Sequence, residues 1–259
     1  MKSFRQAGKP NLRPKKSTLV VGPEAVLAAL TSGQALDKIY LHQTAAGPAY
    51  EQVRQQATAA GVPIQRVPIE KIDHFHVQDH YGCVAVKSKV QYYKVQDVID
   101  QVLERGETPF FLMLDGITDI RNIGGIARSA YAMGVHAIII PDKGVGALNE
   151  DAFLTSAGAL EHILVCRVNS LMKTVDELHL NGIPVYASVM QGEKHITEIP
   201  FNEPCCIVMG GEEKGIYPAL QKICDAAFRI PMPGDFESLN VSVATGIILY
   251  EVVRQRNPA

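Results

Sequence analysis

Three apolar runs of strand length in the C-terminal part of the chain each end in a loop containing glycine or proline and are followed by a helical pattern. They are FFLMLDGITDIRNIGGIARSA, CIVMGGEEKGI and FRIPMPGDFESLNVSVATGIILYE. Units of this kind, in which a strand, a loop and a helix follow one another, build the ligand sites of α/β proteins. The sequence therefore predicts an α/β fold whose chemistry lies in these loops.

Strands and helices alternate from residue 109 to the end of the sequence. The strands are continuously apolar, which is typical of a parallel sheet that is covered by helices on both faces. In such sheets ligands bind beyond the carboxyl ends of the strands. We expect the three loops to meet there, together with residues 188–190 at the end of the apolar run PVYASV.

The loops contain residue types that suit a ligand site. Gly210, Gly211 and Gly215 would let main-chain N–H groups approach a ligand closely. Ser238 and Asn240 are small hydrogen-bonding residues at the start of the last helical pattern, so they are candidates both for function and for capping that helix.

Residues 17–88 read as a separate small α/β module with helical patterns after Gly22-Pro23 and from residue 49. Residues 89–108 are polar except for one helical pattern, and we interpret them as a linker with a first helix. The domain that carries the three loops then spans residues 109–259. The boundary between the two domains is expected near residue 100.

The formal net charge of −2 excludes a uniformly basic nucleic-acid-binding protein. Residues 1–16 nevertheless contain six cations and no acid, so this arm either pairs with RNA phosphates or only keeps the chain in solution. No apolar run is long enough for a membrane helix and no secretory signal is visible, so a cytoplasmic location is expected.

Three neighbouring histidines, His74, His76 and His80, raise the question of a metal site. No second group of Cys, Asp or Glu at ligand spacing accompanies them, so we expect no metal and a structural or RNA-facing role instead. The GGEEKG loop is not a phosphate-binding P-loop, because its spacing differs and no Ser or Thr follows the lysine.

The stretches NIGGIAR, IVMGGEEKG and IPMPGDFESLNVSVATG resemble, in this order, the three motifs of the SpoU (TrmH-like) family of RNA 2′-O-ribose methyltransferases. The resemblance covers residues 109–256 and is greatest to the branch that methylates a guanosine ribose in 23S rRNA. Two positions depart from the family pattern. Gly125 stands where alanine is usual, and Glu213 stands where glycine is commoner.

The resemblance implies a parallel-sheet domain with a deep trefoil knot (the SPOUT, or α/β knot, fold) and a small N-terminal L30e-like domain that binds the RNA substrate. It also implies S-adenosylmethionine as cofactor, RNA as partner and a homodimer formed through the methyltransferase domain. Two alternatives remain open: an enzyme that acts on tRNA or another rRNA site, and a catalytically silent RNA-binding assembly factor.

Family motifs also indicate the site residues. The positions implied in catalysis are Asn122, Arg128, Glu212, Ser238 and Asn240. The positions expected to hold the cofactor are Ser188, Val189, Gly210, Gly211, Gly215, Ile230, Met232, Ser238 and Leu239. Because a guanidinium stays protonated, Arg128 is expected to grip the target phosphate and stabilise the developing alkoxide rather than act as a base.

Helix geometry adds a constraint on Arg128. The apolar stripe of its helix contains Ile123, Ile126 and Ala130, and at about 100° per residue Arg128 faces away from that stripe. Asn122 and Arg128 lie about 120° apart around the helix. One chain would use both only if Asn122 preceded the helix, so we expect a site completed by the second protomer.

Overall fold

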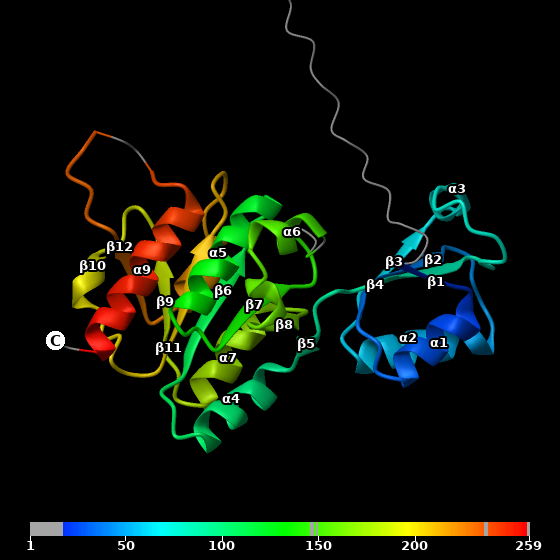
Figure 1. Cartoon of the computed structure of the whole chain (residues 1–259), viewed down its shortest axis with the longest axis horizontal. Coiled ribbons are helices and arrows are strands. Elements are labelled where there is room, and N and C mark those ends of the chain that lie inside the picture. The colour runs from blue at the N-terminus through cyan, green and yellow to red at the C-terminus, as the bar shows by residue number, and fades with distance from the viewer. Residues whose placement is uncertain (1–17, 146–147, 149, 236–237, 258–259) are drawn as a thin grey trace, which may run out of the picture. The chain divides into compact units, whose positions relative to one another are not determined.

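The computed structural model describes residues 18–145, 148, 150–235 and 238–257, which form two compact units (Figure 1). The first unit ends at Ser88 and the second begins at Lys89. The predicted basic arm, residues 1–16, lies outside the described residues.

The first unit contains a four-stranded sheet in the order β1-β4-β2-β3, in which only β2 and β3 are parallel. Its elements are β1 (Leu19–Val21), α1 (Pro23–Thr31), β2 (Leu36–His42), α2 (Pro48–Ala59), β3 (Ile64–Val67), α3 (Ile69–Asp73) and β4 (Cys83–Lys87). Both α1 and α2 begin at proline after a glycine with positive φ, as the pairs Gly22-Pro23 and Gly47-Pro48 favour. The short strand β1 was not predicted.

The second unit is built on eight parallel strands in the order β10-β12-β9-β11-β6-β7-β8-β5, which confirms the expected parallel sheet. The strands are β5 (Tyr92–Tyr93), β6 (Phe110–Asp115), β7 (Ala137–Pro141), β8 (Leu164–Val168), β9 (Val185–Ser188), β10 (Lys194–His195), β11 (Cys205–Gly210) and β12 (Ala226–Arg229). The helices are α4 (Val95–Glu104), α5 (Ile120–Ala132), α6 (Glu150–Thr155), α7 (Leu171–Leu180), α8 (Pro218–Lys222) and α9 (Val241–Arg256).

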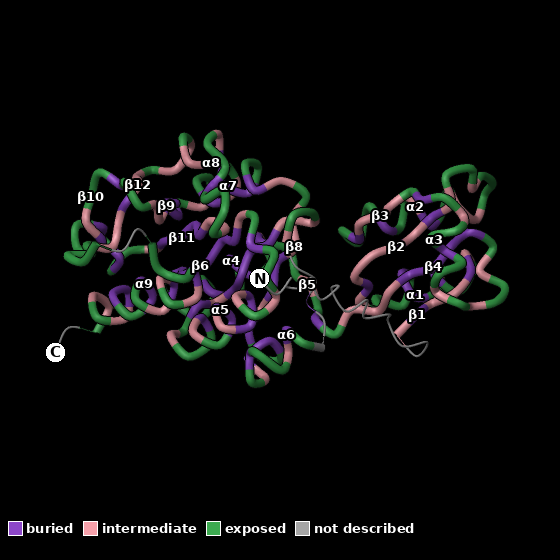
Figure 2. The backbone as a smooth tube through the Cα atoms, turned by 90° about the horizontal axis from the view of Figure 1, so that it is seen from above, coloured by how far each residue is buried: buried purple, intermediate pink, exposed green. Residues whose placement is uncertain are grey.

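Both faces of this sheet are buried, as Figure 2 shows for its central strands. Successive residues of β6 alternate between two cores, with Leu112 in the core that α5 and α9 cover and Met113 in the core that α4 and α7 cover. None of the helices within the described residues is long and apolar enough to cross a membrane.

The segment 89–108 differs from the linker that we predicted. Its strand β5 pairs with β8, and α4 buries Val98 and Ile99 against the sheet. This segment is part of the second unit because the apolar stripe of α4, VQDVIDQVLE, packs on one face of the sheet.

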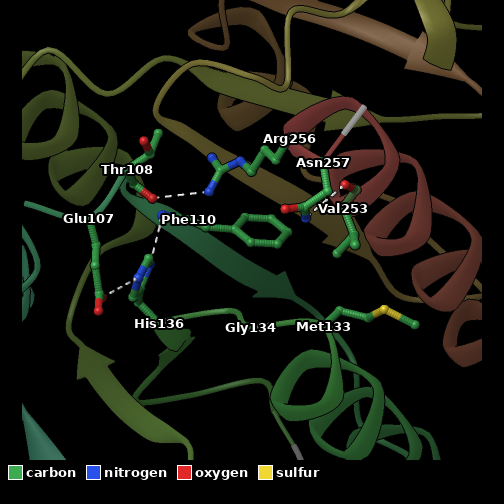
Figure 3. Close-up of a pocket in the computed structure, with 9 residues that line it drawn as sticks. All are labelled: Glu107, Thr108, Phe110, Met133, Gly134, His136, Val253, Arg256 and Asn257. Carbon is green, nitrogen blue, oxygen red and sulfur yellow. Dashed lines mark hydrogen bonds and ion pairs between the residues drawn. The ribbon is translucent and has the colours of Figure 1, made fainter. Parts of the chain in front are cut away.

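At the amino edge of the sheet, Arg256 holds the end of α9 in place (Figure 3). Its guanidinium lies 4.9 Å from the centroid of the Phe110 ring. It donates hydrogen bonds of 2.9–3.1 Å to the main-chain oxygens of Thr108, Pro109, Phe201 and Glu203. One side chain thereby joins the last helix to the loops before β6 and β11.

His136 lies beside this contact as a neutral imidazole. Its Nδ1 accepts the N–H of Phe110 at 3.0 Å, so its Nε2 carries the proton and donates to Glu107 at 3.0 Å (Figure 3). Burial lowers the pKa of His136 below its ordinary value of 6.5, and the bond to Glu107 only partly opposes this effect.

This lowered pKa predicts a pH-dependent loss of stability. Above pH 6.5 His136 is neutral in both the folded and the unfolded chain. Below pH 6.5 the unfolded chain binds a proton at His136 more readily than the folded chain does. The free energy of unfolding should then fall by at most about 1.4 kcal/mol per pH unit from this group. Urea unfolding at pH 7.5 and pH 5.5 measures the loss. The variant His136→Asn, whose side-chain oxygen still accepts from Phe110, should lose less on acidification, and an equal loss would contradict the assignment.

Candidate functional site

One cavity lies beyond the carboxyl ends of β9, β11 and β12, next to the start of α9. Its volume of about 260 Å³ is close to the lower end of the roughly 300–1,000 Å³ that is typical of small-molecule sites. All nine positions that the sequence indicated for a cofactor line this cavity: Ser188, Val189, Gly210, Gly211, Gly215, Ile230, Met232, Ser238 and Leu239.

The cavity walls are mainly apolar. Met209 and Val241 line the cavity as buried side chains, and Met190, Met232 and Leu239 line it while they are 54%, 37% and 36% exposed. Exposed apolar side chains around a hollow that is also lined by main-chain groups are typical of a ligand site.

The structure shows a further physical role for two of the expected glycines. A Cβ at Gly210 would lie 2.3 Å from the carbonyl carbon of Gly215, and one at Gly211 would lie 2.4 Å from the oxygen of Gly116. These positions must therefore be glycine because the loop packs against its own main chain and the loop after β6. Gly215 has a φ of +63°, a backbone conformation that residues with a side chain rarely adopt.

Three of the five predicted catalytic residues form one hydrogen-bonded cluster. Asn122 Nδ2 and Asn240 Nδ2 both donate to Glu212 Oε1, at 3.2 Å and 2.8 Å. Asn240 Nδ2 also donates to Asn122 Oδ1 at 3.0 Å. Glu212 lines the cavity, so the cluster joins the first turn of α5, the loop after β11 and the N-cap of α9 beside the cavity.

The two candidates for capping α9 differ. Asn240 is the N-cap, because its Oδ1 accepts the N–H of Ser242 at 3.0 Å, and it also accepts the Ser242 hydroxyl at 2.6 Å. Ser238 lies two residues before the cap and lines the cavity instead. The capping prediction is therefore confirmed for Asn240 and wrong for Ser238.

Arg128 is not brought into the cluster. It is an exposed residue of α5 and does not line the cavity. Asn122 lies inside α5, since Asp119 is the N-cap and accepts the N–H of Arg121 at 2.9 Å, a bond that lowers the pKa of the Asp119 carboxyl. The alternative in which Asn122 precedes the helix is therefore wrong, and about 120° of rotation separates the two side chains.

Asp115 was given no role from the sequence, yet it holds the loop that carries Glu212. Its carboxylate accepts the N–H of Tyr217 at 2.7 Å, and its main-chain oxygen accepts the N–H of Gly211 at 2.9 Å. Both ends of the loop 211–217 are thus fixed to the end of β6. The signal that could have shown this is an acid as the last residue of a buried strand.

One of the three neighbouring histidines of the first unit has an acidic partner. His80 Nε2 pairs with Asp73 at 3.0 Å. Among the described residues, no group of three or more His, Cys, Asp or Glu side chains could hold a metal ion.

Comparison with known proteins identifies the family. Residues 109–250, more than half of the chain, match the SpoU rRNA Methylase family, and residues 19–93 match the domain described as RNA 2′-O ribose methyltransferase substrate binding. The chain belongs to the SpoU rRNA methylase family. It is therefore an RNA methyltransferase, and its first unit matches the substrate-binding domain of RNA 2′-O ribose methyltransferases.

Relatives of the same family match along nearly the whole chain. A Bacillus subtilis member of the TrmH family of tRNA/rRNA methyltransferases is 36% identical over 239 residues, which cover 92% of this chain and 96% of the relative. The SpoU methyltransferase AviRb of Streptomyces viridochromogenes, solved with AdoMet, shares the fold with a TM-score of 0.59 at 22% identity, covering 96% of this chain and 94% of AviRb. An AdoMet-bound rRNA methyltransferase of Sinorhizobium meliloti gives a TM-score of 0.58 at 24% identity, covering 93% and 88% of the two chains.

The role of Asp115 in holding the loop can be measured by amide hydrogen exchange. In Asp115→Ala the Tyr217 N–H loses its acceptor, so residues 211–217 should exchange at least about tenfold faster, the equivalent of one lost bond to a charged group. Asp115→Asn keeps an accepting oxygen and should stay close to the parent chain. As a control, Asp119→Ala removes the nearby acid that caps α5 and should leave the loop unchanged. Unaltered exchange in Asp115→Ala would contradict the role.

Proposed function

We propose that this enzyme transfers a methyl group from S-adenosylmethionine to a ribose 2′-hydroxyl of RNA, with a guanosine of 23S rRNA as the expected substrate. The observation that supports this best is the position of the Glu212 cluster at the rim of an apolar cavity. A cytoplasmic location belongs to the same proposal.

The residues of the cavity fit S-adenosylmethionine. Apolar side chains such as Ile230 and Leu239 would pack on the adenine ring, and main-chain groups of the loops after β9 and β11 would meet its polar atoms. Two solved structures of similar fold carry AdoMet. When bound, this cofactor supplies an electrophilic methyl group on a positively charged sulfur.

The cluster can orient the ribose hydroxyl. Glu212 Oε1 already accepts from Asn122 and Asn240, whereas no contact of Oε2 is found within the described residues. That second oxygen is therefore placed to accept the 2′-hydroxyl proton in a hydrogen bond and to turn the hydroxyl oxygen toward the cavity. Holding reacting atoms in line is a large part of such catalysis.

Arg128 would manage the negative charge. A protonated guanidinium binds a phosphate through two parallel hydrogen bonds and stabilises charge that develops on a nearby oxygen. The direction of Arg128 on α5, about 120° from Asn122, favours a site in which a second protomer supplies this residue.

An exposed apolar stripe on α9 supports the homodimer. Val243, Ile247 and Tyr250 follow one another at helical spacing and are 52%, 41% and 60% exposed. Because α9 packs against α5, a second copy that covers this stripe would lie close to Arg128. We therefore propose dimerisation through the methyltransferase domain.

The finer features of the fold belong to the proposal as well. A trefoil knot is favoured by the insertion of β11 between β9 and β6, followed by the return of β12 beyond β9. We further propose that residues 17–88 form an L30e-like RNA-binding domain and that the methyltransferase domain begins at Lys89, rather than at residue 109, because β5 and α4 pack in the second unit.

A tRNA substrate is the second candidate, because the relatives of this chain are named for both tRNA and rRNA. A solved structure from work on the 2-OH methylation of C/U34 on tRNA covers 57% of this chain, with 27% sequence identity and a TM-score of 0.52. The rRNA methyltransferase of Sinorhizobium meliloti matches more of this chain, 93%, at 24% identity.

Methyl transfer from labelled S-adenosylmethionine to 23S rRNA and tRNA transcripts tests the function. Arg128→Ala should lower kcat by at least about 100-fold, as loss of one charge-stabilising group does in other enzymes. Arg121→Ala, an exposed arginine of the same helix that pairs with Asp119, serves as the matched control and should keep most of the activity. Methylation at a base rather than at the ribose would refute the proposed reaction.

Mixing two inactive variants tests whether the site is shared. Arg128→Ala and Asn240→Ala are each expected to be inactive, but a mixed dimer contains one site with neither substitution if Arg128 acts across the interface. Co-refolded mixtures should then regain up to about one quarter of the parent activity, since half of the dimers are mixed and each has one intact site. No recovery in a purified mixed dimer would show that each site uses its own Arg128.

A further inference from the structure

The loop 74–82 of the first unit, which joins α3 to β4 (Figure 1), has an unusual backbone. His76, Asp79 and Tyr81 have φ values of 51°, 54° and 43°, a region that residues with a Cβ disfavour. Among the described residues, only one other non-glycine residue, Ala157, has a positive φ. Such a concentration persists only where surrounding contacts enforce it, and it is often found at functional sites.

Hydrogen bonds enforce the conformation around Tyr81. The hydroxyl of Tyr50 donates to the main-chain oxygen of Tyr81 at 2.6 Å. His80 Nδ1 accepts the N–H of Gly82 at 3.0 Å, so His80 Nε2 carries the proton and donates to Asp73. The loop is therefore held both by α2, through Tyr50, and by the end of α3.

Close packing fixes the end of the loop. The oxygen of Gly82 accepts the N–H of His42 at 2.7 Å, and a Cβ at Gly82 would lie 2.9 Å from the Cβ of His42. No larger residue fits between Tyr81 and β4 without displacing β2. The backbone of Tyr81 is thus set by its neighbours.

The ring of Tyr81 is left in solvent. Tyr81 is 69% exposed, and it is the one large apolar residue of the described residues 18–88 that is exposed. No aromatic ring or cation among the described residues stacks on it. A rigid backbone that presents a bare aromatic face loses little conformational entropy when the face is covered.

The surroundings of Tyr81 are polar. His74, His76 and Gln78 of the same loop are exposed. Exposed Arg66 donates to the main-chain oxygen of Gln43, the residue after His42, so a cation lies at the same end of the sheet. A single ring without an apolar patch does not suit a protein partner, whereas aromatic rings beside cations suit single-stranded nucleic acid.

We propose that Tyr81 stacks on an unpaired base of the RNA substrate, with the loop 74–82 as a rigid platform and Arg66 at a neighbouring phosphate. The proposal rests on the proposed function, because the match of residues 19–93 to a substrate-binding domain identifies RNA as the partner of this unit. Every base has a face on which an aromatic ring can stack, so the contact recognises an unpaired nucleotide rather than a sequence.

The absence of tryptophan from the chain allows a direct test. In Tyr81→Trp the new indole is the sole one, and its fluorescence should be quenched in a saturable way by an RNA hairpin with a single-stranded loop. A fully paired RNA duplex of the same length should quench it much less. Leu180→Trp, at an 89% exposed position in the second unit, is the control and should not respond. Equal quenching by hairpin and duplex, or none by either, would overturn the proposal.

Kinetics give an independent readout. With a 23S rRNA transcript, Tyr81→Ala should raise KM about 5- to 100-fold, the range expected for one lost base stack, with kcat little changed. Tyr81→Phe keeps the ring and should retain the KM of the parent chain. Thermal unfolding of each variant identifies a folding defect, which Tyr81→Phe and Tyr81→Trp are designed to avoid.

The two proposals fail in different ways. If the parent chain methylates no RNA, the proposed function fails, and the dissociation constants of Tyr81→Ala and Tyr81→Phe for the hairpin still decide the role of the ring. If the parent chain methylates RNA while Tyr81→Ala keeps the parent KM and dissociation constant, the stacking proposal alone is overturned.

Discussion

The pairing of β11 with β6 is the interaction on which the site depends. Six consecutive residues pair in parallel, from Cys205 opposite Phe110 to Gly210 opposite Asp115. Because parallel strands end at the same edge, the loops after these two strands begin side by side. Asp115 then fixes the loop 211–217, and this places Glu212 within reach of Asn122 on α5. A shift of the register by one residue would separate these groups and reverse the face of every side chain in β11.

The Glu212 cluster contains one carboxylate, two neutral amides and no cation. Two neutral amides hold one oxygen of Glu212, and the described residues that line the cavity contain no cation. The site therefore has a local negative charge that suits a positively charged sulfur donor, but it does not itself neutralise a phosphate. The role proposed for Arg128 would supply this positive charge from outside the cavity, since Arg128 is exposed on α5 and does not line the cavity.

The α/β class, the parallel sheet and the positions of the loops could be predicted because they follow from local patterns. The run FFLMLD predicts a buried strand wherever it lies. The nine cofactor positions came from the family motifs, and they lie at or after the ends of strands or just before α9. Two features depend on contacts distant in sequence. The stripe of α4 predicts a helix but not the sheet that it covers, and β1 has three residues that form a strand only because β4 pairs with them.

Long-range packing also explains what the sequence could not show about Asp115 and the glycines. The partner of Asp115, Tyr217, lies 102 residues away, and the atoms that exclude a Cβ at Gly211 belong to Gly116. Sequence patterns indicate that these positions are special, since acid and glycine follow buried strands there. They do not indicate whether a glycine makes room for a ligand or for another loop of the same chain.

The contact between α5 and α9 gives a physical reason for Gly125, where alanine would be usual. A Cβ at Gly125 would lie 3.2 Å from the Cβ of Ser242, which is tighter than ordinary packing. Ser242 in turn donates to Asn240 Oδ1, so its position affects the amide that holds Glu212. Glycine at position 125 lets the two helices approach closely enough for Asn122 and Asn240 to share one carboxylate oxygen. The departure from the family pattern is thus accommodated beside the Glu212 cluster, at the contact between α5 and α9.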